Sequence, residues 1–170
     1  MRKTIILLAL IFAAFCSNSQ QILVKQFEKT YGGSSNDKLL AMEQTSDDGY
    51  ILVGITSSFG AGGYDVYLVK TDWAGNQIWS KHWGGTGNDE GVSVQQTTDG
   101  GYIIAGSTSS FGAGSNDAYL IKTDANGDSL WTKTFGTASS ENALSVQQTS
   151  DGGYIITGQA VNSYAIYLIT

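Results

Sequence analysis

The sequence contains no proline, one cysteine and one histidine among its 170 residues, and only 14% of the residues are charged. Cys16 alone cannot form an intramolecular disulfide, and His82 alone cannot build the usual zinc site. A Gly-x-Ser-x-Gly nucleophile elbow and a cysteine–histidine arrangement are also missing. Because the common catalytic arrangements lack their ingredients, we expect a chain that is not an enzyme and that uses no cofactor.

Basic residues are scarce as well. Nine Lys and Arg residues stand against 15 Asp and Glu residues, which gives a net charge of -6. An acidic chain is repelled by phosphate backbones and by anionic membrane surfaces. We therefore expect no nucleic-acid partner.

The first 19 residues have the layout of a secretory signal peptide. Arg2 and Lys3 precede an apolar run over residues 5–15, which is too short to span a bilayer. Small residues near Ser19 favour cleavage after that position. The prediction is a signal peptide over residues 1–19 and one mature domain over residues 20–170. Such a chain is exported to the periplasm, the outer surface or the extracellular space.

A lipidated Cys16 is the alternative at this end of the chain. The residues before it resemble a lipobox, but the bulky Phe15 next to the cysteine argues against lipidation. If cleavage follows Ser19, the mature chain has neither a thiol nor a disulfide.

Glycine and aromatic residues are plentiful, and many of them recur every 52 residues. The stretch SVQQTTDGGYIIAG at Ser93 is nearly repeated as SVQQTSDGGYIITG at Ser145, and AMEQTSDDGYILVG at Ala41 is a third copy. We place the repeats at residues 33–84, 85–136 and 137–170, with residues 22–32 as an offset last strand. The repeated positions that we interpret as structural are Gly49, Gly101 and Gly153, then Tyr50, Tyr102 and Tyr154, and finally Trp79 and Trp131.

Each repeat is predicted to form four short strands. In the second repeat these cover residues 91–97, 102–107, 117–123 and 129–135, joined by turn-forming Asp, Asn and Gly residues. The glycine that closes the first turn of each repeat is expected to supply a positive φ.

The second and third strands carry adjacent apolar residues, such as Ile103-Ile104 and Leu120-Ile121, rather than strict alternation. This pattern indicates strands that are buried on both faces, as in sheets stacked face to face. We predict an all-β fold of three four-stranded antiparallel repeats, propeller-like, as an open three-blade arc or a fragment of a larger propeller. A closed threefold β-prism or trefoil is the alternative.

The run GGTGNDEGVSVQQTTDGGYIIAGSTSSFGAGSNDAYLIKTDANGDSLWTKTFG resembles a repeat of bacterial and archaeal cell-surface proteins. The resemblance covers residues 21–170 and implies a β-propeller, although those proteins usually carry more copies and often a carboxy-terminal sorting domain. The segment AYLIKTDANGDSLWTKT is similar, more weakly, to bulb-type mannose lectins, without their intact Gln-x-Asp-x-Asn-x-Val-x-Tyr pattern. Neither resemblance supplies a catalytic residue.

Three aromatic residues are the candidate ligand contacts. Phe59 and Phe111 lie in two identical TSSFGAG loops, and loops on a rigid scaffold are the usual place for binding. Trp73 replaces Ala125 in a turn, where an exposed indole could stack on a sugar ring or a partner.

Three acidic residues, Asp37, Asp89 and Glu141, share one position of the repeat. If these positions converge around an axis, the carboxylates could hold Ca²⁺. The alternative, which we favour, is that each carboxylate accepts hydrogen bonds from nearby turns.

Taken with the resemblance, these features predict an exported, non-catalytic module for binding or structural assembly at the cell surface. The expected partners are a second copy or further blades, a polysaccharide, or a cell-surface protein. A carbohydrate-binding, lectin-like domain is the alternative function.

Overall fold

The computed structural model describes residues 27–161 and 163–169, which form eleven β-strands and no helix. The predicted all-β fold is therefore confirmed. No helix in the described residues is long and apolar enough to cross a membrane. The predicted signal peptide, Cys16 and residues 22–26 of the offset strand lie outside the described residues.

The strands form three antiparallel sheets, and consecutive strands are neighbours in each of them. The first sheet contains β1 (Asp37–Gln44), β2 (Tyr50–Thr56), β3 (Asp65–Thr71) and β4 (Gln77–Trp83). The second contains β5 (Asp89–Gln96), β6 (Tyr102–Thr108), β7 (Asp117–Thr123) and β8 (Ser129–Phe135). The third contains β9 (Glu141–Gln148), β10 (Tyr154–Ala160) and β11 (Ser163–Ile169). One sheet thus corresponds to one sequence repeat.

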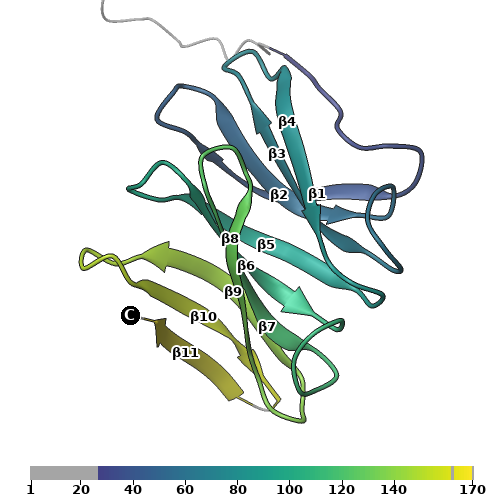
Figure 1. The fold of residues 1–170 in the computed structure, drawn as a ribbon, viewed down its shortest axis with the longest axis vertical. Coiled ribbons are helices and arrows are strands. Elements are labelled where there is room, and N and C mark those ends of the chain that lie inside the picture. Colours follow the sequence, from purple (N-terminus) through teal and green to yellow (C-terminus); the bar gives the residue numbers. More distant parts are fainter. Residues whose placement is uncertain (1–26, 162, 170) are drawn as a thin grey trace, which may run out of the picture.

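The three sheets are stacked one on another in chain order (Figure 1). One apolar cluster joins the first sheet to the second and includes Leu68 and Ile104. Another joins the second to the third and includes Leu120 and Ile156. Alternate residues in the middle of β6 and β7 therefore point to different neighbours, which explains why adjacent central residues of these strands are apolar.

Aromatic pairs hold successive sheets together at matching positions. Trp79 of β4 packs on Tyr102 of β6 with ring centroids 5.9 Å apart, and Trp131 of β8 packs on Tyr154 of β10 at the same distance. Both pairs meet edge to face, an arrangement that the quadrupoles of aromatic rings favour.

Residues 27–32 lie against the first sheet much as β4 lies against the second. Phe27 packs on Tyr50 with ring centroids 6.3 Å apart, and Lys29 Nζ is 3.0 Å from Asn76 Oδ1. The matching contact of β4 joins Lys81 Nζ to Asp128 Oδ1 at 2.7 Å. These described residues are not in a strand, so the predicted offset strand is not seen within them.

The glycines that close the first turns have a different role from the predicted one. Positive φ occurs one residue earlier, at Asp48 (63°), Gly100 (84°) and Gly152 (89°). A Cβ on Gly101 would lie 2.1 Å from the carbonyl oxygen of Thr123. Gly49, Gly101 and Gly153 are thus required by the close approach of the neighbouring strand, not by their own backbone angles.

The two junctions between sheets differ in the sizes of the side chains that meet at one position of the repeat. A Cβ on Gly91 would lie 2.5 Å from Val53 Cγ2 and 2.9 Å from Val66 Cγ1. At the second junction the matching residues are Ala143, Ala105 and Ala118, which belong to one cluster. The second junction therefore accommodates a methyl group because the two opposing valines are replaced by alanines.

We expect Gly91→Ala to lower the free energy of unfolding by about 1–2 kcal/mol, because the added methyl group overpacks the first junction. Urea unfolding measures this cost. Adding Val53→Ala should make the double variant more stable than the sum of the two single effects predicts, since neighbouring sites couple. Strict additivity would contradict the proposed overlap.

Candidate functional site

The acidic residues at the shared position each bind their own loop. Asp89 accepts hydrogen bonds from Gly85 N at 2.9 Å, from Ser110 Oγ at 2.6 Å, and from Thr108 Oγ1. Asp37 accepts the equivalent bonds in the first repeat, from Gly33 N, Ser58 Oγ and Thr56 Oγ1. Glu141 bonds the backbone N and the hydroxyl of Thr137.

These carboxylates do not form a joint metal site. Within the described residues, no group of three or more His, Cys, Asp or Glu side chains is placed to hold a metal ion. Burial acts to raise the pKa of Asp37, but the hydrogen bonds from Thr56, Ser58 and Gly33 outweigh it and leave that pKa below its ordinary value. The arrangement is that of a turn acceptor, the favoured alternative of the sequence analysis.

A second carboxylate lies beside Asp89, and another lies beside Glu141. Asp65 and Asp89 flank Gly84, where an added Cβ would come 2.1 Å from Asp65 Oδ1 and 2.6 Å from Asp89 Oδ2. Asp117 and Glu141 flank Gly136 in the same way. Burial, together with the negative charge of Asp89, raises the pKa of Asp65. Asp65 and Asp117 accept hydrogen bonds from the loops that precede them, whereas Asp89 and Glu141 bind the segment that follows the preceding sheet.

The two TSSFGAG loops fold back over their own sheets. The ring of Phe59 lies 5.8 Å from that of Tyr67 and 6.2 Å from that of His82, and Phe111 lies 5.9 Å from Tyr119. The two phenylalanines nevertheless stay 40% and 45% exposed. Phe111 helps to line an open cleft of about 560 Å³, together with Asp65, His82 and Trp83.

Trp73 is the most exposed large apolar side chain of the described residues, at 72%. Its turn is held by Asp72, whose carboxylate accepts hydrogen bonds from the N–H groups of Ala74 and Asn76. A groove of about 640 Å³ lies beside the indole and is lined also by Phe27, Lys29, Gln44, Asp48, Tyr50, Ala74 and Asn76. The combination of an exposed indole and hydrogen-bonding side chains suits a polar ligand with a flat apolar face.

The structure separates these candidate contacts. Trp73 lies in the turn between β3 and β4, at the end of the sheets where Asp47 closes the first turn. Phe59 and Phe111 lie in loops that follow β2 and β6, at the opposite end of the strands. No single site can use all three residues.

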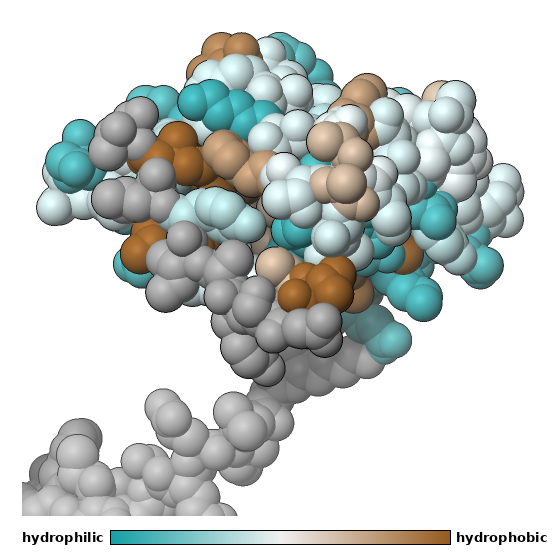
Figure 2. Space-filling model, turned by 90° about the horizontal axis from the view of Figure 1, so that it is seen from below, coloured by the Kyte–Doolittle hydropathy of each residue, from teal (hydrophilic) through white to brown (hydrophobic). Residues whose placement is uncertain are grey.

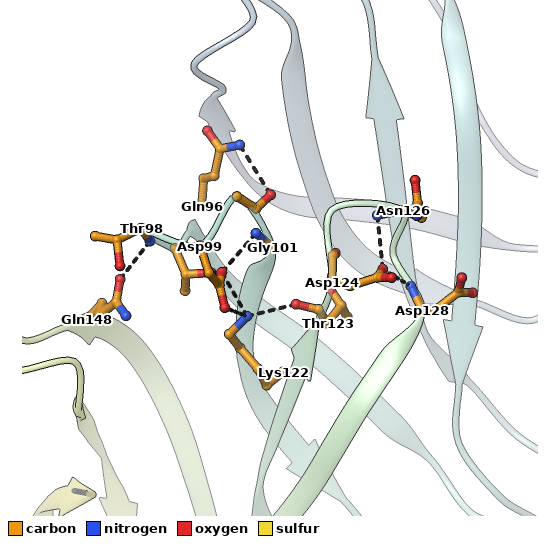
Figure 3. A network of polar contacts seen from close by, with 12 residues as sticks. Gln96, Thr98, Asp99, Gly101, Lys122, Thr123, Asp124, Asn126, Asp128 and Gln148 are labelled. Atoms are coloured by element: carbon orange, nitrogen blue, oxygen red, sulfur yellow. Dashed lines mark hydrogen bonds and ion pairs between the residues drawn. The ribbon is translucent and has the colours of Figure 1, made fainter.

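Two polar networks were not anticipated from the sequence. In the first, Lys122 is buried, and its Nζ binds Asp99 Oδ2 at 2.9 Å and the carbonyl oxygen of Thr123 at 2.8 Å (Figure 3). Lys70 binds Asp47 and Thr71 in the same way. The recurrence of Asp and Lys at the 52-residue spacing was the available signal, but nothing in it shows that the two side chains meet.

The second network joins neighbouring sheets through glutamine and glutamate side chains. At each junction a side chain of one sheet accepts a hydrogen bond from a backbone N–H of the first strand of the next sheet, which is β5 or β9. A glutamine side chain on that strand accepts a hydrogen bond from a backbone N–H of the preceding sheet in return. The four bonds run from Gln96 N to Glu43 Oε2 (2.7 Å), from Ser46 N to Gln96 Oε1 (2.8 Å), from Gln148 N to Gln95 Oε1 (2.6 Å) and from Thr98 N to Gln148 Oε1 (2.9 Å). The repeated Gln-Gln pair was the available signal in the sequence, but it does not show that these side chains link sheets.

No protein-family model matches the chain. The chain is similar to the regulatory protein FlaEY of Caulobacter vibrioides, with 28% identity over 109 residues that cover 56% of this chain. The chain spans 11% of the length of FlaEY.

Proposed function

We propose that the chain is an exported, non-catalytic, β-propeller-like repeat module for binding or structural assembly at the cell surface. The observation that carries this proposal is the stacking of the sheets through two junctions with the same aromatic pairs and the same side-chain hydrogen bonds. A β-prism turns only one face of each sheet to the core, whereas the middle sheet here is covered on both faces. This favours blades of a propeller over a closed threefold fold.

The loops give the module its binding surface. A stack of rigid sheets presents the TSSFGAG loops side by side in successive repeats, with a partly exposed phenylalanine on each. Repetition of one apolar contact suits a partner that is itself repetitive, such as a polysaccharide or an array of surface proteins.

Export is tested by expressing the full chain in a bacterium and fractionating the cells. We expect the protein outside the cytoplasm, with a mature N-terminus at Gln20 by mass spectrometry. An acylated N-terminal Cys16 would instead establish lipid anchoring. Cytoplasmic protein that retains Met1 would contradict the proposed function.

Carbohydrate binding is the second candidate function, and the exposed Trp73 beside its groove favours it. If the indole stacks on a sugar ring, Trp73→Ala should weaken retardation of the protein in affinity gels of mannan, cellulose or chitin by about tenfold or more, equivalent to at least ~1.4 kcal/mol. The fold should be unaffected, within about 0.5 kcal/mol, because Ala125 occupies the same turn position in the second repeat. Equal retardation of both proteins would exclude Trp73 from the site.

A further inference from the structure

The two outermost faces of the stack have the residues that, at the internal junctions, lie on the two opposing sides of the contact between sheets. We call the face of the β1–β4 sheet that is turned away from the second sheet the first end face. The corresponding outer face of the β9–β11 sheet is the second end face. We assign residues to these end faces from the two internal junctions, where the equivalent residues contact a neighbouring sheet.

Each end face has an apolar position that is exposed where its counterparts at the internal junctions are buried. Met42 on the first end face is 58% exposed, whereas the matching Val94 and Val146 are 8% and 6% exposed. Ile155 on the second end face is 36% exposed, whereas Ile103 at the same position is fully buried. Figure 2 views the molecule from the side of the third sheet and shows hydrophobic side chains on that surface.

The polar groups of the end faces are complementary as well. Gln44 on the first end face matches Gln96 and Gln148, which donate and accept one hydrogen bond each at the internal junctions. Gln147 on the second end face matches Glu43 and Gln95, the acceptors of those junctions. Both Gln44 and Gln147 are exposed. One end of the molecule therefore bears the partners that the other end needs.

Residues 27–32 are also placed to complete the third sheet of another copy. They lie on the first sheet as β4 lies on the second, and in the described residues β11 pairs with β10 alone. In the first two sheets the third strand pairs with a fourth, for example Tyr67 with His82 and Tyr119 with Thr134. The same register sets Thr30 of one copy opposite Tyr167 of another.

We propose that a second copy of this chain docks head to tail, its first end face on the second end face of the other copy, with residues 27–32 as the fourth strand of the partner's third sheet. A contact between different surfaces either closes a ring or grows without limit. Two copies stack about six sheets, within the roughly 4–8 blades of known propellers. The predicted assembly is a closed dimer, and it rests on the propeller-like arrangement in the proposed function.

Sedimentation velocity of the protein purified after export, at roughly 10 μM and above the Kd of a micromolar contact, tests the assembly. We expect a single species of twice the chain mass. Met42→Arg should convert it to a folded monomer, because a charge would be buried in the junction. Ile78→Arg is the matched control, since Ile78 is 58% exposed and its counterpart Leu130 stays 59% exposed with a sheet in front of it. A wild-type monomer, a filament, or a dimeric Met42→Arg protein would overturn the proposal.

Disulfide trapping tests the register separately. In a Cys16→Ser background, Thr30→Cys with Tyr167→Cys should give a covalent dimer on a non-reducing gel, because directly paired residues have the Cα spacing that a disulfide needs. Lys29→Cys with Tyr167→Cys should not, since the Lys29 side chain points to the other face. Equal cross-linking by both pairs would reject the register. An exported monomer would refute the dimer and leave the proposed function intact, whereas a cytoplasmic dimer would do the reverse.

Discussion

Replacement of Gly106 by alanine is expected to lower the free energy of unfolding by about 3 kcal/mol or more, at the upper end of the cost of overpacking. Gly106 lies in β6 opposite the bulge of β5, where the register shifts between Gly91 and Ser93. A Cβ at this position would lie 1.7 Å from the carbonyl oxygen of Glu90 and 2.7 Å from its carbonyl carbon. Both are backbone atoms, so relief requires β5 to move away from β6.

The consequence extends beyond one sheet, because β5 also carries the junction with the first sheet. Val94 of β5 belongs to the cluster that includes Leu68 of β3 and Ile104 of β6. A displaced β5 would open this cluster. Against a total stability of about 5–15 kcal/mol for a typical domain, the loss is large enough to populate unfolded chains.

Urea unfolding followed by tryptophan fluorescence measures the effect. Gly152→Ala is the matched control, because Gly152 has a positive φ of 89° and an added Cβ there would have no atom within 4 Å. That variant has a backbone penalty without a clash, and we expect a cost of about 1 kcal/mol. If Gly106→Ala costs no more than Gly152→Ala, the bulge does not require glycine.

Much of this architecture could be predicted from the sequence because the three repeats can be compared with one another, position by position. The predicted strands at residues 117–123 and 129–135 coincide with β7 and β8, since both are bounded by turn residues with strong local preferences. The first predicted strand, residues 91–97, begins two residues late relative to β5. Asp89 extends that strand by pairing with Thr108, a partner that local sequence cannot reveal.

The candidate site was harder to predict because it depends on which residues meet across sheets. The sequence identified Trp73 as exposed because its counterpart is an alanine, and the structure places it at the surface. The sequence did not indicate that Gln96 and Gln148 link sheets, since an amide side chain can equally bond to water. It also assigned a positive φ to Gly101, although the positive angle belongs to Gly100.

Asp99→Ala should lower the free energy of unfolding by about 2–3 kcal/mol, because it leaves a buried ammonium group on Lys122 without a counter-charge. The Lys122 side chain is 4% exposed, and the carboxylate is its anionic partner at 2.9 Å. The cost stays below the ~3–5 kcal/mol of a fully buried pair because the Asp99 side chain is 57% exposed and water screens it.

Two further variants separate the pair from the packing. Asp99→Ala with Lys122→Met should recover most of the loss, because methionine fills the space without a charge to solvate. Asp151→Ala is the control in the third repeat, where Thr170 replaces the lysine in the sequence, and it should cost less than Asp99→Ala. Equal costs for Asp99→Ala and Asp151→Ala would show that the turn, and not the ion pair, provides the stability.

Lowering the pH should remove the stabilisation that the Asp99–Lys122 ion pair provides. The hydroxyl of Thr97, the ammonium group of Lys122 and the N–H of Gly101 lower the pKa of Asp99 to about 2 against the opposing effect of burial. An unfolded aspartate has a pKa of about 3.9, so the unfolded chain binds the proton first as the pH falls. The stabilisation is complete above about pH 4 and is lost as the pH falls toward about 2. Urea unfolding at pH 7 and about pH 3 should show this loss for the wild type and a smaller one for Lys122→Met, and an equal loss in both would assign the acid sensitivity to other carboxylates.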